Sequence, residues 1–378
     1  MPKQKSQLIV SGTLVYGDDL EDRTGYAVIE SGKIKEIGEG EKIEADVTGI
    51  VIPSFVNAHT HIGDSVAKEP DFMPLDELVG PGGYKHKILA ETSHNELVSS
   101  MKDSIEDIFA TGTGLFADFR EGGVLGVKAL KEAFDSAQGR EKVDMKIFGR
   151  PETDELRIFE SADGIGISSV ADYPWEGVKR LAAETAKRDG KMFALHAGER
   201  NAEDVEGAIE LEPDFIVHLT KASQQDFEKM QDKNIAAVVC IRSNLMTGVG
   251  LPPLCQMLEA GLTVGVGTDN VMLNSPDMFT EMEFIAKIFR LEEREVLRMC
   301  TLDSAKVLKE EKFVGSIEEG KTANLVVIRS DTPNMRGVRN SIRGVVRRAT
   351  RNDIAAVIYE GVVVKQLIRQ KCKLFILI

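Results

Sequence analysis

Five side chains of kinds that bind metal ions each follow a short apolar run in this chain. His59 and His61 lie in VNAHTHIGD, His196 in FALHAGE, His218 in FIVHLT and Asp269 in VGVGTDN. The apolar runs predict strands and the residues after them predict loops, so all five stand at C-terminal strand ends. When strands alternate with helices, these ends face one side of the fold, where (β/α)8 barrels carry their active sites.

The same residues predict a metal site. His59 and His61 are two positions apart on one strand and therefore point to the same face. A single buried histidine is more often a core residue than a ligand, but four of the six histidines fall at these strand ends. Three or four His and Asp ligands with an open position suit a catalytic divalent ion.

The composition indicates a soluble globular protein. A chain of 378 residues with 42% hydrophobic and 29% charged residues can bury a large core. The net charge of −14 argues against a nucleic acid or an anionic membrane as the main partner. The four cysteines form no CxxC pair, which fits a cytoplasmic location. The apolar run near the start of the chain is too short for a signal peptide.

The apolar pattern divides the chain into three segments. Residues 1–52 read as short strands with glycine turns, and residues 312–378 return to strand-like runs such as NLVVI, GVVRR and IAAVIYEGVVV. Between them, residues 53–311 alternate strands with amphipathic helices and contain eight candidate strands: SFVNAH, GLFADF, MKIFGR, GIGIS, MFALH, FIVHL, AAVVCI and TVGVG. We therefore expect a (β/α)8 TIM-type barrel with a small composite β-domain built from both chain ends.

The motifs resemble those of the amidohydrolase superfamily, in its cytosine deaminase-like and chlorohydrolase-like branch. The resemblance rests on PSFVNAHTH at 53–61, HAGE at 196–199, the strand-end His218, GTDN at 267–270 and GSIEEGKTANLVVI at 315–328. In the last motif the family usually has Asp where Asn324 stands. The resemblance implies a metal-dependent hydrolase whose end segments form a composite β-sandwich and, by analogy, a homodimer.

The resemblance also implies a single metal ion. Binuclear relatives usually carry a carboxylated lysine at the end of the fourth strand, where this chain reads DGIGISSVAD with no lysine. The expected ion is Zn²⁺ or Fe²⁺, which the sequence does not separate. Its expected ligands are His59, His61, His196 and Asp269.

Three residues are expected to act on the reaction. Glu199 stands three positions after His196, and this HxxE spacing marks the deaminase branches of the superfamily. A carboxylic acid there can protonate a ring nitrogen beside the attacked carbon. His218 is expected to stabilise the tetrahedral state, and Asp269 to accept a proton from water as well as bind metal.

Basic residues near the expected active face suggest an anionic substrate. Three arginines follow predicted strands: Arg120, Arg150 and Arg242. Lys85 and Lys87 lie in the long loop after the first barrel strand. Arginine suits carboxylate or phosphate binding. The alternative is that the arginines form structural ion pairs with neighbouring carboxylates such as Glu121, Glu152 or Asp118.

These features together predict hydrolytic deamination of an aminated heterocycle, such as a purine or pyrimidine base or a nucleoside derivative. The expected partner is this small molecule rather than nucleic acid or membrane. Hydrolysis of a cyclic amide or of a C–Cl bond on the same site is the first alternative. The second is a non-catalytic metal-binding protein, which is disfavoured because Glu199 and His218 accompany the ligands.

Overall fold

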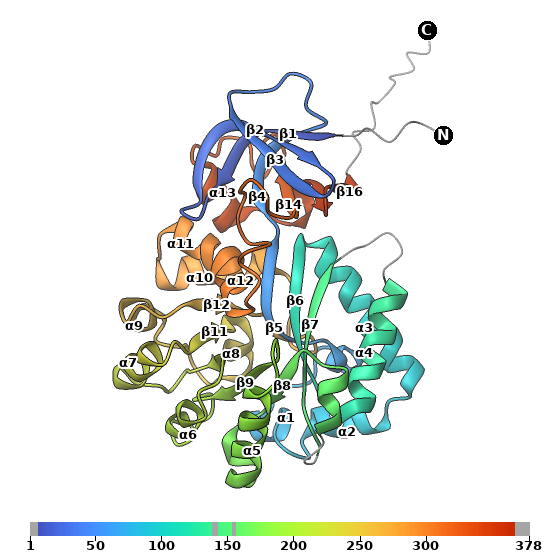
Figure 1. The fold of residues 1–378 in the computed structure, drawn as a ribbon, viewed down its shortest axis with the longest axis vertical. Helices are drawn as coiled ribbons and strands as arrows, with labels where there is room; N and C mark the ends of the chain where they lie inside the picture. Colours follow the sequence, from blue (N-terminus) through green and yellow to red (C-terminus); the bar gives the residue numbers. More distant parts are fainter. Residues whose placement is uncertain (1–6, 138–142, 153–155, 367–378) are drawn as a thin grey trace.

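The computed structural model describes residues 7–137, 143–152 and 156–366, in two parts that lie one above the other in Figure 1. The upper part is a mixed β-sheet, and the lower part is a parallel sheet surrounded by helices. The apolar C-terminal run KLFILI, expected as a final strand or a packed tail, lies outside the described residues. Within the described ranges, no helix is long and apolar enough to cross a membrane.

Both ends of the chain contribute to the upper sheet, whose strand order is β16-β15-β14-β4-β1-β2-β3. Its strands are β1 (Leu8–Tyr16), β2 (Glu21–Glu30), β3 (Lys33–Glu39), β4 (Val47–Pro53), β14 (Leu325–Ile328), β15 (Ile354–Tyr359) and β16 (Val362–Gln366). Strands from the two ends meet where β4 pairs antiparallel with β14. The pairing of the two ends is therefore present in the structure, whereas the sandwich form stays a prediction.

The parallel pairing of β1 with β4 depends on two glycines. Gly12 and Gly49 face each other in the register, and Gly12 has a φ of +134°. A Cβ atom on Gly12 would collide with the carbonyl oxygen of Gly49, so only glycine allows this close approach.

One predicted strand of the C-terminal segment is wrong. The run GVVRR at 344–348 belongs to helix α13 (Ser341–Arg348) and not to a strand. Ile342, Val345 and Val346 are buried on one side of this helix, at spacings of three and four residues. A short apolar run cannot be assigned to strand or helix from its own pattern, and here the helical spacing extends back to Ile342.

The lower sheet contains all eight strands predicted for the barrel. They are β5 (Phe55–His61), β6 (Thr113–Arg120), β7 (Asp144–Gly149), β8 (Gly164–Ile167), β9 (Met192–Ala197), β10 (Phe215–His218), β11 (Ala236–Val239) and β12 (Val264–Val266). Each pairs in parallel with the next. The short strand β13 (Asp269–Asn270) follows β12 and pairs with β5, so the sheet curls back to its first strand, as in a TIM-type fold.

Helices connect these strands and pack around the sheet (Figure 1). From β5 onward these helices include α3 (His94–Ala110), α4 (Gly123–Ala137), α5 (Trp175–Ala186), α6 (Val205–Glu210), α7 (Gln224–Asp232), α8 (Ile241–Thr247), α9 (Leu254–Glu259), α10 (Met278–Phe289), α11 (Glu293–Arg298) and α12 (Ser304–Val307). The segment after β5 contains the 3-10 helix η1 (Ile62–Ala67), α1 (Leu75–Leu78) and α2 (Tyr84–Glu91). Further 3-10 helices are η2 (Leu156–Glu160), η3 (Val170–Asp172) and η5 (Arg351–Asp353), and η4 (Met299–Asp303) is a π-helix.

The C-terminal ends of the lower strands are closely packed beneath the candidate site. Every residue of β5 is buried, and so is every residue of β6 and β9. Phe119 on β6 packs edge-on against His59, with ring centroids 4.5 Å apart. An apolar floor of this kind fixes the histidine rings and excludes water from below them.

Candidate metal centre and active site

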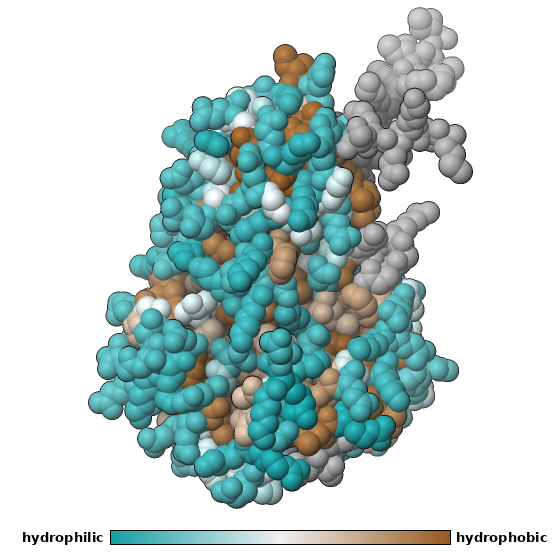
Figure 2. Space-filling model, in the orientation of Figure 1, coloured by the Kyte–Doolittle hydropathy of each residue, from teal (hydrophilic) through white to brown (hydrophobic). Residues whose placement is uncertain are grey.

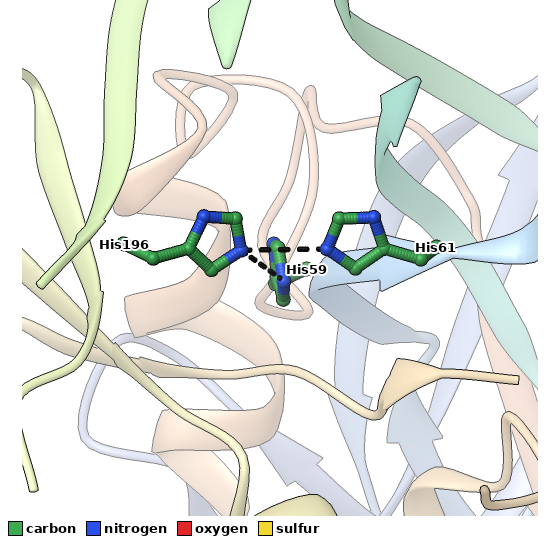
Figure 3. Close-up of side chains that lie close together, drawn as sticks. All are labelled: His59, His61 and His196. Carbon is green, nitrogen blue, oxygen red and sulfur yellow. Dashed lines mark hydrogen bonds between the residues drawn. The ribbon is translucent and has the colours of Figure 1, made fainter. Parts of the chain in front are cut away.

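Three histidines converge at the strand ends (Figure 3). The Nε2 atom of His196 lies 3.2 Å from that of His59 and 3.3 Å from that of His61. The Oδ1 atom of Asp269 lies 3.3 Å from His59 Nε2 and 3.7 Å from His61 Nε2. The four side chains are buried, so their ligand atoms form one compact group inside the protein. All four residues predicted as metal ligands therefore come together.

The protonation states of this group fit a divalent ion. Burial lowers the pKa of His61 to about 3 and lowers the pKa of His196 well below its usual range, so both rings are neutral. His196 Nδ1 donates to the carbonyl oxygen of Ile167 at 2.9 Å, and His61 Nδ1 donates to that of Phe119 at 3.0 Å. Their Nε2 atoms are then lone-pair acceptors that face one another, an arrangement that a bound cation would stabilise.

Glu121 contacts the candidate ligand His61, a contact that sequence reasoning missed. Its Oε1 atom lies 2.9 Å from His61 Nδ1, on the side of the ring away from the ligand group. Carboxylates in this position orient a ligating histidine and increase its basicity. The signal in the sequence was its place directly after strand β6, at the active face.

Asp269 is held in a strained backbone conformation. Its φ is +60°, and that of His218 is +75°, values that residues other than glycine rarely adopt. Burial alone would raise the pKa of Asp269, but its hydrogen bond with His59 and the neighbouring histidines lower it well below the usual range. Ser243 donates to its second oxygen, Oδ2. Strain of this kind occurs where the structure imposes a functional geometry.

Glu199 and His218, which the sequence predicts to act on the reaction, lie beside the group of candidate ligands. His218 Nε2 lies 3.6 Å from Glu199 Oε2 and 4.0 Å from Asp269 Oδ2. The other ring nitrogen of His218 is 3.0 Å from Asn244 Oδ1, which orients the ring and was missed in the sequence. Burial raises the pKa of the Glu199 carboxyl, so this group holds a proton to higher pH than an exposed glutamate.

A cavity of about 330 Å³ opens above these residues. His61, His196, Glu199, His218 and Asp269 form its floor and wall. Other lining residues come from the segment after β5 and from the loops after β7, β8 and β9, and they include Leu75, Val79, Lys85, Arg150, Ser169, Arg200 and Asp204. The size is at the low end of the range for small-molecule sites.

The three arginines predicted for substrate binding differ in their surroundings. Arg120 is buried, donates to Glu121 and lies 3.8 Å from Asp118. Arg242 is buried and donates to Glu281. Neither lines the cavity, so for these two the geometry favours the alternative of structural ion pairs. Arg150 does line it, and its Nε atom is buried with no hydrogen-bond partner among the described residues.

Lys85 on α2 is the second cation in the cavity wall. It is buried, and its Nζ atom lies 2.7 Å from Glu121 Oε1 and 3.6 Å from Asp64 Oδ2. Lys87, also noted in the sequence, is exposed on the same helix and does not line the cavity. The segment after β5 therefore brings one ammonium group to the site.

Comparison with known proteins supplies the family. The family model of the amidohydrolase family matches residues 50–364. An uncharacterized protein of Methanocaldococcus jannaschii is 37% identical over 374 residues, covering 92% of this chain and 96% of that protein. A 5-methylthioadenosine/S-adenosylhomocysteine deaminase of Thermoanaerobacter pseudethanolicus is 27% identical over 386 residues, covering 88% and 86% of the two chains.

Solved structures share the fold at low sequence identity. A triazine hydrolase variant superposes with a TM-score of 0.81 at 17% identity, covering 96% of each chain. An adenosine deaminase from Xanthomonas campestris with bound zinc superposes with a TM-score of 0.76 at 18% identity, covering 96% of this chain and 94% of that one.

The chain belongs to the amidohydrolase family. The resemblance stated from the sequence motifs is thereby confirmed, and so is the enzyme class, a hydrolase that acts on carbon–nitrogen bonds other than peptide bonds.

Proposed function

We propose that this protein catalyses the hydrolytic deamination of an aminated heterocycle of the purine or pyrimidine type, using one divalent metal ion. The observation that carries the proposal is the position of Glu199, whose partly buried carboxyl lies in the cavity wall beside His218. The relative named as a 5-methylthioadenosine/S-adenosylhomocysteine deaminase supports the same reaction.

His59, His61, His196 and Asp269 would hold the ion, which supplies a Lewis acid that lowers the pKa of water. Glu199 in its protonated form would donate to the ring nitrogen beside the attacked carbon. Asp269 would accept a proton from water, and His218 would donate a hydrogen bond to the oxygen that is added. The C–O bond forms, the C–N bond to the exocyclic amine breaks, and ammonia leaves.

An anionic group on the substrate is the second part of the proposal. Lys85 and Arg150 both line the cavity, and both lie near Glu121, at 2.7 Å and 3.6 Å from its Oε1 atom. Two cations of the cavity wall therefore share the Glu121 carboxylate, and the Nε atom of Arg150 has no hydrogen-bond partner among the described residues. A carboxylate or phosphate would suit this wall, because burying a cation without a partner is costly.

Ammonia release tests the reaction. The metal-loaded protein is assayed with 5-methylthioadenosine, S-adenosylhomocysteine, adenosine and adenosine monophosphate, together with triazine and cyclic-amide substrates. We expect metal-dependent ammonia release from an aminated heterocycle. Turnover of a chlorinated triazine or a cyclic amide without ammonia would replace deamination by the alternative hydrolysis, and no turnover of any compound would favour a non-catalytic protein.

Glu199→Gln tests the proposed general acid. This change keeps the shape of the side chain and removes its transferable proton, so kcat should fall by about 10²–10⁴ at unchanged metal content. Glu203→Gln is the matched control, because Glu203 lines the same cavity but is exposed. Full activity of Glu199→Gln with the metal in place would contradict the assignment.

We further propose which metal ion the enzyme binds, how its chain divides into domains, and its oligomeric state and location. The ion is zinc or iron, and the zinc in the Xanthomonas campestris structure supports zinc. The chain is proposed to divide into a β-sandwich from residues 1–52 and 312–378 and a closed barrel from residues 53–311, and to act as a cytoplasmic homodimer. Elemental analysis tests the ion, and light scattering of the purified protein tests the dimer.

A further inference from the structure

Helix α13 of the upper part packs on helices α10 and α11 of the lower part (Figure 1). A groove of about 610 Å³ lies beside this contact and is lined from α10, α13 and the segment before α13. Five of its lining side chains are cations, whereas Glu283 is the one lining carboxylate among the described residues. The cations are Lys287, Arg339, Arg343, Arg347 and Arg348. This concentration of positive charge stands out on a chain whose net charge is −14.

The two central arginines are held in place by one buried carboxylate. Arg343 Nε donates to Glu293 Oε1 at 3.0 Å, and Arg347 donates to the same oxygen. The Glu293 side chain is 6% exposed, while those of Arg343 and Arg347 are 57% and 43% exposed. The carboxylate therefore orients both guanidinium groups but neutralises only one charge, and their remaining N–H groups face the solvent.

A third arginine is oriented by a neutral group, so its positive charge is not neutralised. Arg348 donates through Nε and Nη2 to the amide oxygen of Asn334, at 3.3 Å in both cases. Arg351, by contrast, has a carboxylate of its own, Asp107, at 2.7 Å. The three oriented arginines of the groove instead share one carboxylate and one neutral amide.

We propose that this groove binds a compact anion with at least two phosphate groups, such as the diphosphate chain of a nucleotide. Planar guanidinium groups match phosphate oxygens in pairs, and groups that are already oriented lose less entropy on binding. The volume is that of a small-molecule site, and junctions between packed units are a common place for one. A long nucleic acid would also meet the acidic remainder of the surface, whereas a compact anion experiences mainly the local charge.

This inference is independent of the proposed deamination, because the groove and the cavity share no lining residue. Isothermal titration of the full-length, metal-loaded protein with inorganic pyrophosphate tests it, with orthophosphate and a single-stranded oligonucleotide as comparison ligands. We expect one pyrophosphate per chain, bound more tightly than either comparison ligand and more weakly as the salt is raised from 50 to about 200 mM.

Substitutions inside and outside the groove test where pyrophosphate binds. Arg343→Gln should weaken pyrophosphate binding about tenfold or more, and Arg339→Gln, which leaves the pairs of Glu293 intact, should weaken it in the same direction. Arg23→Gln is the matched control, since Arg23 lies on β2 outside the groove and should leave the affinity unchanged. Circular dichroism checks that each variant is folded.

Three results would overturn the proposal. The first is no saturable binding of pyrophosphate by the wild-type protein. The second is binding outside the groove, shown either by wild-type affinity in both Arg339→Gln and Arg343→Gln or by a loss of binding in Asp269→Ala, which would locate the anion at the metal centre. The third is tighter binding of the oligonucleotide than of pyrophosphate through the same arginines, which would make the groove a nucleic-acid surface.

Discussion

Replacing Arg242 by methionine distinguishes a structural arginine from one that binds substrate. Arg242 donates from Nε to Glu281, from its backbone N–H to Glu281 Oε1 at 3.1 Å, and from Nη2 to the carbonyl oxygen of Ser275 at 2.8 Å. The Glu281 side chain is 0% exposed. Methionine fills much of the same volume but leaves this carboxylate without its cation.

The size of the effect follows from that burial. Removing one partner of a buried ion pair costs about 3–5 kcal/mol, because the remaining charge stays away from water. Unfolding entropy is about 2.1 cal/mol/K per residue, which for 378 residues unfolding as one unit gives about 0.8 kcal/mol/K. Arg242→Met should therefore lower Tm by about 4–6 °C.

Thermal unfolding and steady-state kinetics together test this prediction. Arg188→Met is the control, because Arg188 is partly exposed and pairs with Glu184 on the surface, where an ion pair contributes at most about 1 kcal/mol. The double variant Arg242→Met with Glu281→Gln should recover part of the lost stability, since it no longer buries an unpaired charge. An unchanged Tm with a strongly raised KM would refute the reasoning and return Arg242 to substrate binding.

Three further predictions concern the site itself. His59→Ala or Asp269→Ala should lose the metal ion, since too few ligands remain, and elemental analysis should find about one ion per wild-type chain; two would contradict the single site. Lys85→Met should raise KM for an anionic substrate about tenfold and leave that for a neutral analogue nearly unchanged; an equal rise for both would exclude an electrostatic role. Burial raises the pKa of Asp64 to about 7, so the folded chain keeps a proton that the unfolded chain releases. The free energy of unfolding should therefore fall as pH rises from about 4 to about 7, and denaturant titrations should show a smaller fall in Asp64→Asn.

The barrel strands, and the place of the candidate metal ligands at their ends, could be predicted because central parallel strands are buried on both faces. Such strands appear as continuous apolar runs, and β5 and β9 are examples in which every residue is buried. A polar residue that ends such a run must lie at the active face, whichever helices follow. This reasoning does not depend on any long-range contact, so it succeeds from sequence alone.

The parts that sequence could not predict depend on contacts between distant residues. The sequence offers Arg242 either a substrate or a nearby carboxylate, whereas its partner Glu281 stands 39 positions away on another helix. His218 is oriented by Asn244, 26 positions away, and nothing near either residue indicates the contact. Strand β13 was missed because two residues carry no periodic pattern, although its pairing with β5 brings Asp269 to the histidines.

Glu121 shows how such contacts link parts of the site that the sequence presents as separate. Its Oε1 atom lies near both the Nδ1 atom of the ligand His61 and the Nζ atom of Lys85, and its Oε2 atom accepts from Arg120. Burial would raise its pKa, but these neighbouring cations and His61 lower it well below the usual range, so the group is ionised. One carboxylate thus contacts a candidate metal ligand, pairs with a cation of the cavity wall and pairs with a buried arginine. An anion that reaches Lys85 competes with Glu121 for that cation, and the electrostatic environment of His61 then depends on what the cavity contains.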